Sequence, residues 1–140
     1  NGMSDLIAVA VGDELPPLDL PLTRSDVVRY SGASTDFNPI HYNDRLARAI
    51  GLPGVVVHGM WTMGAALRIV TDWVGDPSKV VSYFVRFVAP VPVPDDDQGT
   101  TVRVCAKVSA VSDDLITIAI EATHGDDKVL GAAKEEVRRK

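Results

Sequence analysis

One segment decides the fold: residues 58–73 read HGMWTMGAALRIVTDW, and they are almost wholly apolar. The large apolar residues of this segment do not fall on a single stripe but cover most of the circumference of a helix: Met60, Trp61, Met63, Leu67, Ile69 and Val70. A helix that is apolar nearly all round is a buried one. The sequence therefore predicts a long buried helix at the centre of the molecule.

Downstream of this helix, apolar and polar residues alternate at period two. The apolar residues that share one face are Val102, Val104, Ala106 and Val108 in one segment, and Ile116, Ile118, Ile120 and Ala122 in the next. Turn residues separate the segments at 112–114 and 125–127, at hairpin spacing, and Val80–Val88 is a further strand between two prolines. We expect an antiparallel sheet whose apolar face packs on the helix.

Upstream of the helix, the chain is mixed and carries several turn signals. A strand is expected around Leu18–Leu22. Thr23 can cap a helix that has Asp26 in its first turn and that stops at Ser31-Gly32. The run Asp44–Ile50 predicts another helix.

Residues 34–41, which read STDFNPIH, carry the first chemical signal. Asn38 can cap a short helix with Pro39 in its first position, which puts His41 third and Asp36 in the loop just before. A carboxylate and an imidazole aimed into one volume form an acid–base pair near neutral pH. Taken alone, the segment favours a structural interpretation, with the carboxylate capping a turn and the imidazole bonded to a backbone carbonyl.

Residues 55–60, which read VVVHGM, carry the second signal, because a glycine stands at the head of the buried helix. Amides there lack an intrahelical partner and lie at the positive end of the helix dipole. A substrate carbonyl oxygen could reach the Gly59 N–H, which is the arrangement of an oxyanion hole. Taken alone, Gly59 is more simply explained by crowding between helix and sheet, and His58 by a structural role.

Together, residues 36–41 followed some seventeen residues later by residues 58–60 resemble the hydratase-2 motif of the MaoC-like dehydratase family. The resemblance extends from Leu22-Thr23 to Val80–Val88 and the segment 90–93. It is nearest to the small catalytic subunits of actinobacterial (3R)-hydroxyacyl-carrier-protein dehydratases. Each motif alone would be a weak signal, whereas the two in this order and spacing are specific.

The resemblance implies an α+β chain with a single hot-dog fold, in which a curved antiparallel sheet wraps around one long buried helix. We expect this domain to span residues 3–140, with Asn1 and Gly2 as a cloning remnant ahead of Met3. The family pairs two such sheets into one, so the implied partner is a second copy (homodimer) or another hot-dog subunit (heterodimer).

The family roles carry onto matching positions of this sequence. Asp36 and His41 correspond to the catalytic dyad, and Gly59, Asn38 and His58 to the oxyanion and substrate-binding side. The implied activity is that of a hydro-lyase acting reversibly on (3R)-hydroxyacyl and trans-2-enoyl thioesters of fatty-acid metabolism. Acyl-CoA or acyl carrier protein would present the substrate, with no cofactor and no metal.

Two features leave alternatives open. Some hydratases of the family place a serine on the long helix to orient the aspartate, whereas this helix offers only Thr62 and Thr71 as hydroxyls after its first glycine. A hot-dog thioesterase would need a carboxylate on or beside the helix, and the first one available is Asp72, at the far end. A third alternative is a dehydratase subunit that is active only with a non-catalytic partner.

Composition excludes several other classes of protein. The net charge of −5 argues against binding of nucleic acid, and no run of 18 apolar residues predicts a membrane span. The single cysteine, Cys105, excludes an intrachain disulfide, and a cytoplasmic protein is expected. The three histidines show no metal-ligand spacing, and His124 is expected in a solvent-exposed turn.

Overall fold

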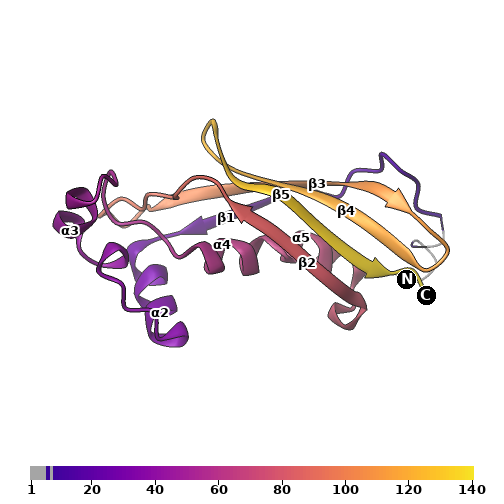
Figure 1. Cartoon of the computed structure of the whole chain (residues 1–140), viewed down its shortest axis with the longest axis horizontal. Coiled ribbons are helices and arrows are strands. Elements are labelled where there is room, and N and C mark those ends of the chain that lie inside the picture. The colour runs from indigo at the N-terminus through magenta and orange to yellow at the C-terminus, as the bar shows by residue number, and fades with distance from the viewer. Residues whose placement is uncertain (1–5, 7) are drawn as a thin grey trace.

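Within the part of the chain that the structure describes, residue 6 and residues 8–140, five strands form one antiparallel sheet in the order β1-β3-β4-β5-β2 (Figure 1). The strands of this computed structural model are β1 Leu18–Leu22, β2 Val80–Phe87, β3 Thr100–Val111, β4 Leu115–His124 and β5 Asp127–Arg138. The antiparallel sheet and its strands are confirmed. The expected domain start at Met3 and the remnant Asn1-Gly2 lie outside the described residues.

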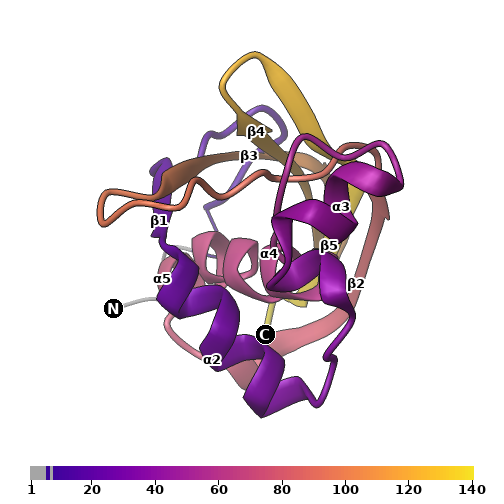
Figure 2. The ribbon, with the colours of Figure 1, turned by 90° about the vertical axis from the view of Figure 1, so that its left-hand side faces the viewer.

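The helices lie on one side of the sheet, which curves around α4 (Figure 2). Their bounds are α2 Arg24–Ser34, η1 Pro39–His41, α3 Asp44–Ala49, α4 Gly59–Ala66, α5 Arg68–Val74 and η2 Pro77–Lys79. Helices α4 and α5 together occupy the place of the predicted long helix, and they follow the length of the sheet (Figure 1). The predicted hot-dog arrangement is confirmed.

The central helix differs from the prediction in two respects. It is interrupted at Leu67, where the Val70 N–H donates to the Leu67 carbonyl at 3.0 Å, a tighter turn than that of an α-helix. Its burial is also one-sided: the buried residues are Thr62, Ala66, Ile69, Val70 and Val74. Met60 is 57% exposed, so the expectation of burial all round was wrong. The sheet covers only the side of the helix that faces it.

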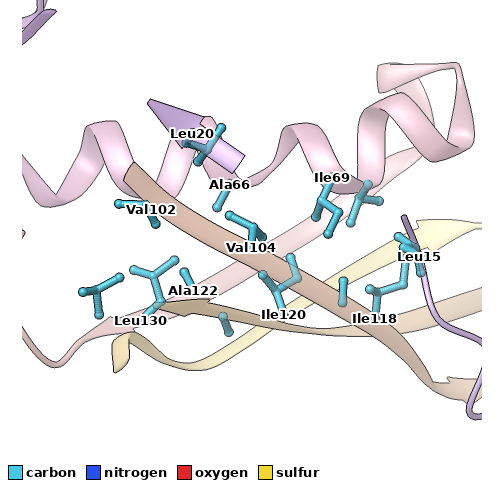
Figure 3. Close-up of a cluster of buried hydrophobic side chains, with 14 of the residues drawn as sticks. Leu15, Leu20, Ala66, Ile69, Val102, Val104, Ile118, Ile120, Ala122 and Leu130 are labelled. Carbon is cyan, nitrogen blue, oxygen red and sulfur yellow. The ribbon is translucent and has the colours of Figure 1, made fainter. Parts of the chain in front are cut away.

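The core lies between the concave face of the sheet and α4–α5 (Figure 3). Ala66 and Ile69 extend toward the buried face of β3, on which Val102 and Val104 lie. The predicted inward faces of β3 and β4 are confirmed, because their register pairs apolar residues of like orientation, such as Val108 with Ile118. Burial of each such side chain contributes about 1.5–3 kcal/mol.

Helix α2 begins as predicted and ends later than predicted. The Thr23 N–H donates to Asp26 Oδ2 at 2.8 Å in a capping box. Ser31 and Gly32 do not stop the helix, which continues to Ser34 and reverses at Thr35, where φ is +61°. Ser31 is buried, so its packing inside the molecule overrides its local preference for a turn.

Two further predictions concern exposure. His124 ends β4, half-buried, with Nε2 2.7 Å from the Thr100 hydroxyl, so the expectation of a solvent-exposed turn was wrong. Cys105 is exposed on β3. Of the helices in the described residues, none is both long and apolar enough to cross a membrane.

Candidate functional site

The loop from α2 to η1 is built by short polar side chains that bond to their own backbone. Asp36 Oδ1 accepts the Asn38 N–H at 3.2 Å, and Asn38 Oδ1 accepts the Ile40 N–H at 3.2 Å. Asn38 therefore caps η1 as predicted, with Pro39 first and His41 third. This geometry carries the imidazole inward and leaves the carboxylate at the rim.

The Asp36 carboxylate and the His41 imidazole face each other, with 3.7 Å between Oδ2 and Nε2. The His41 side chain is 7% exposed and that of Asp36 51%. His41 Nδ1 lies 2.7 Å from the Val56 carbonyl, which can only accept, so Nδ1 carries a proton. In the neutral ring the lone pair is then on Nε2, directed toward the carboxylate.

His58 lies directly against His41, and their rings are stacked with centroids 3.6 Å apart and planes 20° apart. The side chain is buried, and its Nε2 is 3.2 Å from both Ser31 Oγ and the Asp36 carbonyl oxygen. Burial, with a smaller contribution from the charge of His41, lowers the pKa of His58. Burial therefore favours the neutral form of this ring more than it is favoured in a free histidine.

Gly59 is the first residue of α4, and it is exposed. Among the described residues its N–H has no hydrogen-bond acceptor, as the first amide of a helix requires. A Cβ at this position would lie 3.0 Å from the ring of Phe87, so a side chain here would require that ring to shift. Gly59 thus has both features considered for it: an N–H without an acceptor in the described part of the chain and a close neighbour on the sheet.

These groups border one cavity of about 690 Å³. Its polar members are Tyr30, Ser34, Asp36, His41, His58 and Thr62. Its apolar wall comes from the end of β2 and the segment after it, residues 87–91, from residues 129 and 130, and from Ile40, Leu52, Val56, Val57 and Met60. A volume of this order accommodates a small organic ligand. The cavity is therefore the candidate site.

Of the two helix hydroxyls singled out in the sequence, only Thr62 borders the cavity. Thr71 does not contribute to its wall. Within the described residues Thr62 makes no hydrogen bond to Asp36, whose carboxylate is held by the Asn38 N–H instead. A local Asx turn thus takes the place of a hydroxyl contact from the long helix.

An ion pair behind the cavity fixes the segment that leads into α4. Arg24 donates to both Asp44 oxygens, at 2.9 and 3.1 Å, and Asp44 Oδ1 also accepts the Val55 N–H at 2.8 Å. The Val55 N–H bond, together with Arg24, lowers the pKa of Asp44. The Val55–Val57 segment, whose middle carbonyl binds His41, is thereby tied to α2 and α3.

The fold also brings together a group of potential metal ligands that the sequence spacing did not indicate. One ligand atom from each of Asp36, His41 and His58 lies within 4.8 Å of the other two. Both imidazoles already use one nitrogen in a protein hydrogen bond. The donor set of these three residues is therefore partly occupied by the protein itself.

Sequence reasoning missed three residues of this site. Ser31 was interpreted as a helix stop, yet it bonds to His58 from inside α2. The ring of Tyr30 is tilted against the His58 ring, and the two ring centroids are 4.7 Å apart. Phe87 covers Gly59. Only Ser31, a small polar residue within a helical segment, carried a local signal, and it had a simpler local interpretation.

A family model described as "MaoC like domain" matches residues 8–124. Over 83 residues the chain is 39% identical to 3-hydroxyacyl-thioester dehydratase X of Mycobacterium tuberculosis, which covers 58% of this chain and 29% of that protein. Over 123 residues it is 36% identical to the fatty acid synthase subunit beta of Aspergillus oryzae, covering 85% of this chain and 6% of that protein. The chain thus spans less than a third of either relative.

Solved structures with the same fold include a MaoC-like dehydratase at a TM-score of 0.90 and 36% identity, which covers 95% of this chain and 41% of that one. A chain of the ChsH1–ChsH2 complex from Mycobacterium tuberculosis has a TM-score of 0.78 and 28% identity, with coverage of 92% and 98%. The second neighbour comes from a complex of two different subunits.

Proposed function

Because this chain belongs to the MaoC-like dehydratase family, we propose that it adds water reversibly to trans-2-enoyl thioesters to give (3R)-hydroxyacyl thioesters. The observation that carries the proposal is the approach of three groups to one cavity: the Asp36 carboxylate, His41 Nε2 and the Gly59 N–H. Each corresponds to one requirement of the reaction.

The dyad handles protons. In hydration, a group of the pair removes a proton from water as the oxygen bonds to C3, and the pair delivers a proton to C2, so the enzyme ends with the protons it began with. His41 is prepared for this role because its Nδ1–H is held by the Val56 carbonyl, which leaves Nε2 free to accept. General acid–base catalysis of this kind contributes about 10²–10⁴-fold.

The Gly59 amide stabilises charge on the thioester oxygen. As C2 gains or loses its proton, negative charge develops on that oxygen, and a free N–H at a helix start meets it without rearrangement. Asn38 keeps the loop in place by capping η1. His58 belongs to the same wall of the cavity, between the dyad and the helix start.

The reaction itself requires no redox change and no metal, so we propose that the enzyme works without a cofactor beyond the carrier of its substrate. Both CoA and a carrier protein present a phosphopantetheine arm and negative charge. A cytoplasmic location agrees with the absence of a disulfide framework in the sequence, and it stays a prediction.

A thioesterase of this fold would need a carboxylate on or beside the central helix, next to the cavity. Asp72 pairs with Arg68 across one turn of α5, 3.9 Å apart and exposed, and it does not border the cavity. Asp36 is the carboxylate at the cavity, beside an imidazole. This arrangement favours proton transfer at C2 and C3 over attack of water on the carbonyl.

We further propose that a second hot-dog subunit, identical or different, covers β2. This edge strand exposes a row of large apolar side chains: Val81, Phe84, Phe87 and, just beyond it, Val88. Phe87 and Val88 also border the cavity, so a partner there would close it. The opposite edge strand, β1, contains Pro21 and is less suited to pairing.

Turnover of crotonyl-CoA, followed by loss of the enoyl-thioester absorbance, tests the proposed reaction. Asp36→Asn and His41→Ala are each expected to lower the rate by about 10²–10⁴-fold with an unchanged circular dichroism spectrum. Asp72→Asn is the matched control and should retain the rate. Near wild-type turnover in either dyad variant, or thiol release without hydration, would contradict the proposal.

The partner surface is tested by sedimentation of the purified chain. Phe84→Asp is expected to convert the dimer to monomer and to lower turnover, because it puts a charge in the centre of the apolar row. Val28→Asp, on α2 and similarly exposed, is the control. A wild-type chain that is monomeric and fully active at micromolar concentration would exclude a required partner.

A further inference from the structure

His58 is a buried polar residue whose contacts determine where its proton lies. Its side chain is 3% exposed, and Nε2 is 3.2 Å from the Asp36 carbonyl oxygen. A carbonyl oxygen can only accept, so Nε2 must donate. Ser31 Oγ, at the same distance, accepts a share of this N–H and ties it to α2.

The surroundings of the other ring nitrogen of His58, Nδ1, also favour a proton on Nε2. Nδ1 is buried, and it has no hydrogen-bond partner among the described residues. A proton on Nδ1 would be a buried donor without an acceptor, which is unfavourable because it loses its hydrogen bond to water and gains none in return. A bare lone pair is tolerated more easily, and the lowered pKa of His58 agrees with a single proton, on Nε2.

The faces of the ring are also occupied. His41 stacks against it at 3.6 Å, and Tyr30 lies tilted against it at 4.7 Å. His58 therefore touches both members of the dyad: the backbone of Asp36 through its N–H, and the imidazole of His41 through its face. Neither contact uses an atom that could reach a substrate, since the N–H points at protein.

The two histidines bind crosswise, in the sense that each donates a hydrogen bond to the backbone of the segment that carries the other. His41, on the loop segment, donates to the Val56 carbonyl just before α4, and His58, at the start of α4, donates to the Asp36 carbonyl on the loop. Each segment thus holds the other, and stacking locks the two rings together. A displacement of either segment would break one bond and disturb the stack.

We propose that His58, anchored by Ser31, is the positioning residue of the dyad, a role that rests on the proposed hydratase function. It fixes the backbone of the loop that carries the Asp36 carboxylate, and it holds His41 in the orientation in which Nε2 faces that carboxylate. Among the described residues no hydroxyl of α4 or α5 bonds to the Asp36 carboxylate. The Asn38 N–H holds the carboxylate itself, and the His58 N–H holds the main chain that carries it.

Two substitutions at this position separate the ring from the N–H. His58→Phe keeps a stacked ring and removes the donor, whereas His58→Gln removes the ring and keeps an amide N–H where Nε2 was. We expect His58→Phe to lower kcat for crotonyl-CoA by about 10²-fold, the usual effect of a displacement of about 1 Å. KM should change less than threefold, and His58→Gln should recover at least about tenfold of the loss.

Two further variants complete the series. Ser31→Ala should lower kcat by about threefold, because the Asp36 bond stays. His124→Phe, the same change at a half-buried histidine outside the cavity, is the control and should leave kcat unchanged. Full activity of His58→Phe would show that ring packing alone matters and would overturn the proposal. Equal losses in His58→Phe and His58→Gln at equal thermal stability would show that the N–H at Nε2 does not carry the role, and would also overturn it.

A measurement independent of turnover uses the ¹⁵N shifts of the imidazole rings in labelled wild-type protein. His58 is expected as the neutral Nε2–H tautomer at about pH 7 to 8, above the ordinary histidine pKa of 6.5, because burial lowers its pKa further. A proton on Nδ1, or titration above that value, would overturn the assignment. If wild-type protein does not hydrate crotonyl-CoA, the proposed function is wrong. The tautomer measurement would still test separately whether the His58 N–H donates to the Asp36 carbonyl.

Discussion

Glu135 is a carboxyl group buried in the core, and replacing it should change how stability depends on pH. It lies on β5 between Ile118 of β4 and Tyr83 of β2, on the face that packs against the central helix. Its side chain is fully buried, and neither carboxyl oxygen has a partner among the described residues. Because burial penalises the charged form, the pKa of Glu135 rises from 4.5 to about 8.

The size and sign of the effect follow from proton linkage. The folded state binds the proton more tightly than the unfolded state, so the stabilisation is fully present below about pH 4.5 and is lost as the pH rises to about 8. A difference between 4.5 and about 8, at about 1.4 kcal/mol for each pH unit, corresponds to at most about 5 kcal/mol in the free energy of unfolding. Glu135→Gln cannot titrate, and it should remove this slope.

Urea unfolding at a fixed protomer concentration from pH 5 to 9 measures the difference. The free energy of unfolding of Glu135→Gln, relative to that of wild type, is expected to be several kcal/mol higher at the alkaline end of this range than at the acidic end. Glu136→Gln is the matched control, because that neighbour lies on the other face, where it accepts a bond from the Ser82 hydroxyl. Parallel pH curves for wild type and Glu135→Gln, within about 1 kcal/mol, would refute the reasoning.

Two other changes test the frame of the site. Gly59→Ala should lower kcat by about tenfold or more, because a Cβ 3.0 Å from the Phe87 ring must displace either that ring or the helix start that supplies the N–H; unchanged kinetics would show that neither matters. Asp44→Asn should cost about 1–3 kcal/mol in urea unfolding near pH 7, because it weakens the bonds to Arg24 and the Val55 N–H. Since the pKa of Asp44 is lowered, its contribution should be lost as the pH falls below about 3.8, where the variant and wild type should converge.

The sheet could be predicted from the sequence because period-two alternation reports directly on which face is buried. The same alternation that turns Ala133 and Val137 inward also turns Glu135 inward, but a carboxylate among charged neighbours gives no local sign of burial. The stop predicted at Ser31-Gly32 failed for a related reason. Ser31 satisfies its hydroxyl with His58, a contact with a residue 27 positions away that no local pattern encodes.

The candidate residues of the site came from the resemblance of residues 36–41 and 58–60 to a family motif, and backbone constraints predicted only their local geometry. Asn38 and Pro39 set the geometry of η1, and Gly59 marks the start of α4, so the direction of each segment follows from capping rules. Their mutual distance does not, since it depends on how α2 and the Val55–Val57 segment pack. The local geometry of each segment therefore follows from the sequence. The distances between the segments, including the stacking of the two imidazoles, follow only from the structure.

The crosswise bonds of the two histidines explain why two short motifs carry more information together than apart. His41 without the Val56 carbonyl would lose its fixed tautomer, and His58 without the Asp36 carbonyl would be a buried donor with half its bonds. The first motif contains the donor His41 and the acceptor carbonyl of Asp36, and the second contains the donor His58 and follows directly on the acceptor carbonyl of Val56. The residues between them, 42–55, connect the two motifs, and within this connection Asp44 accepts the Val55 N–H and so holds the second motif in place. Loop closure itself has an entropic cost that grows slowly with length. Changes in that connection away from Asp44 and Val55 should therefore be tolerated as long as positions 36, 41, 56 and 58 stay in register.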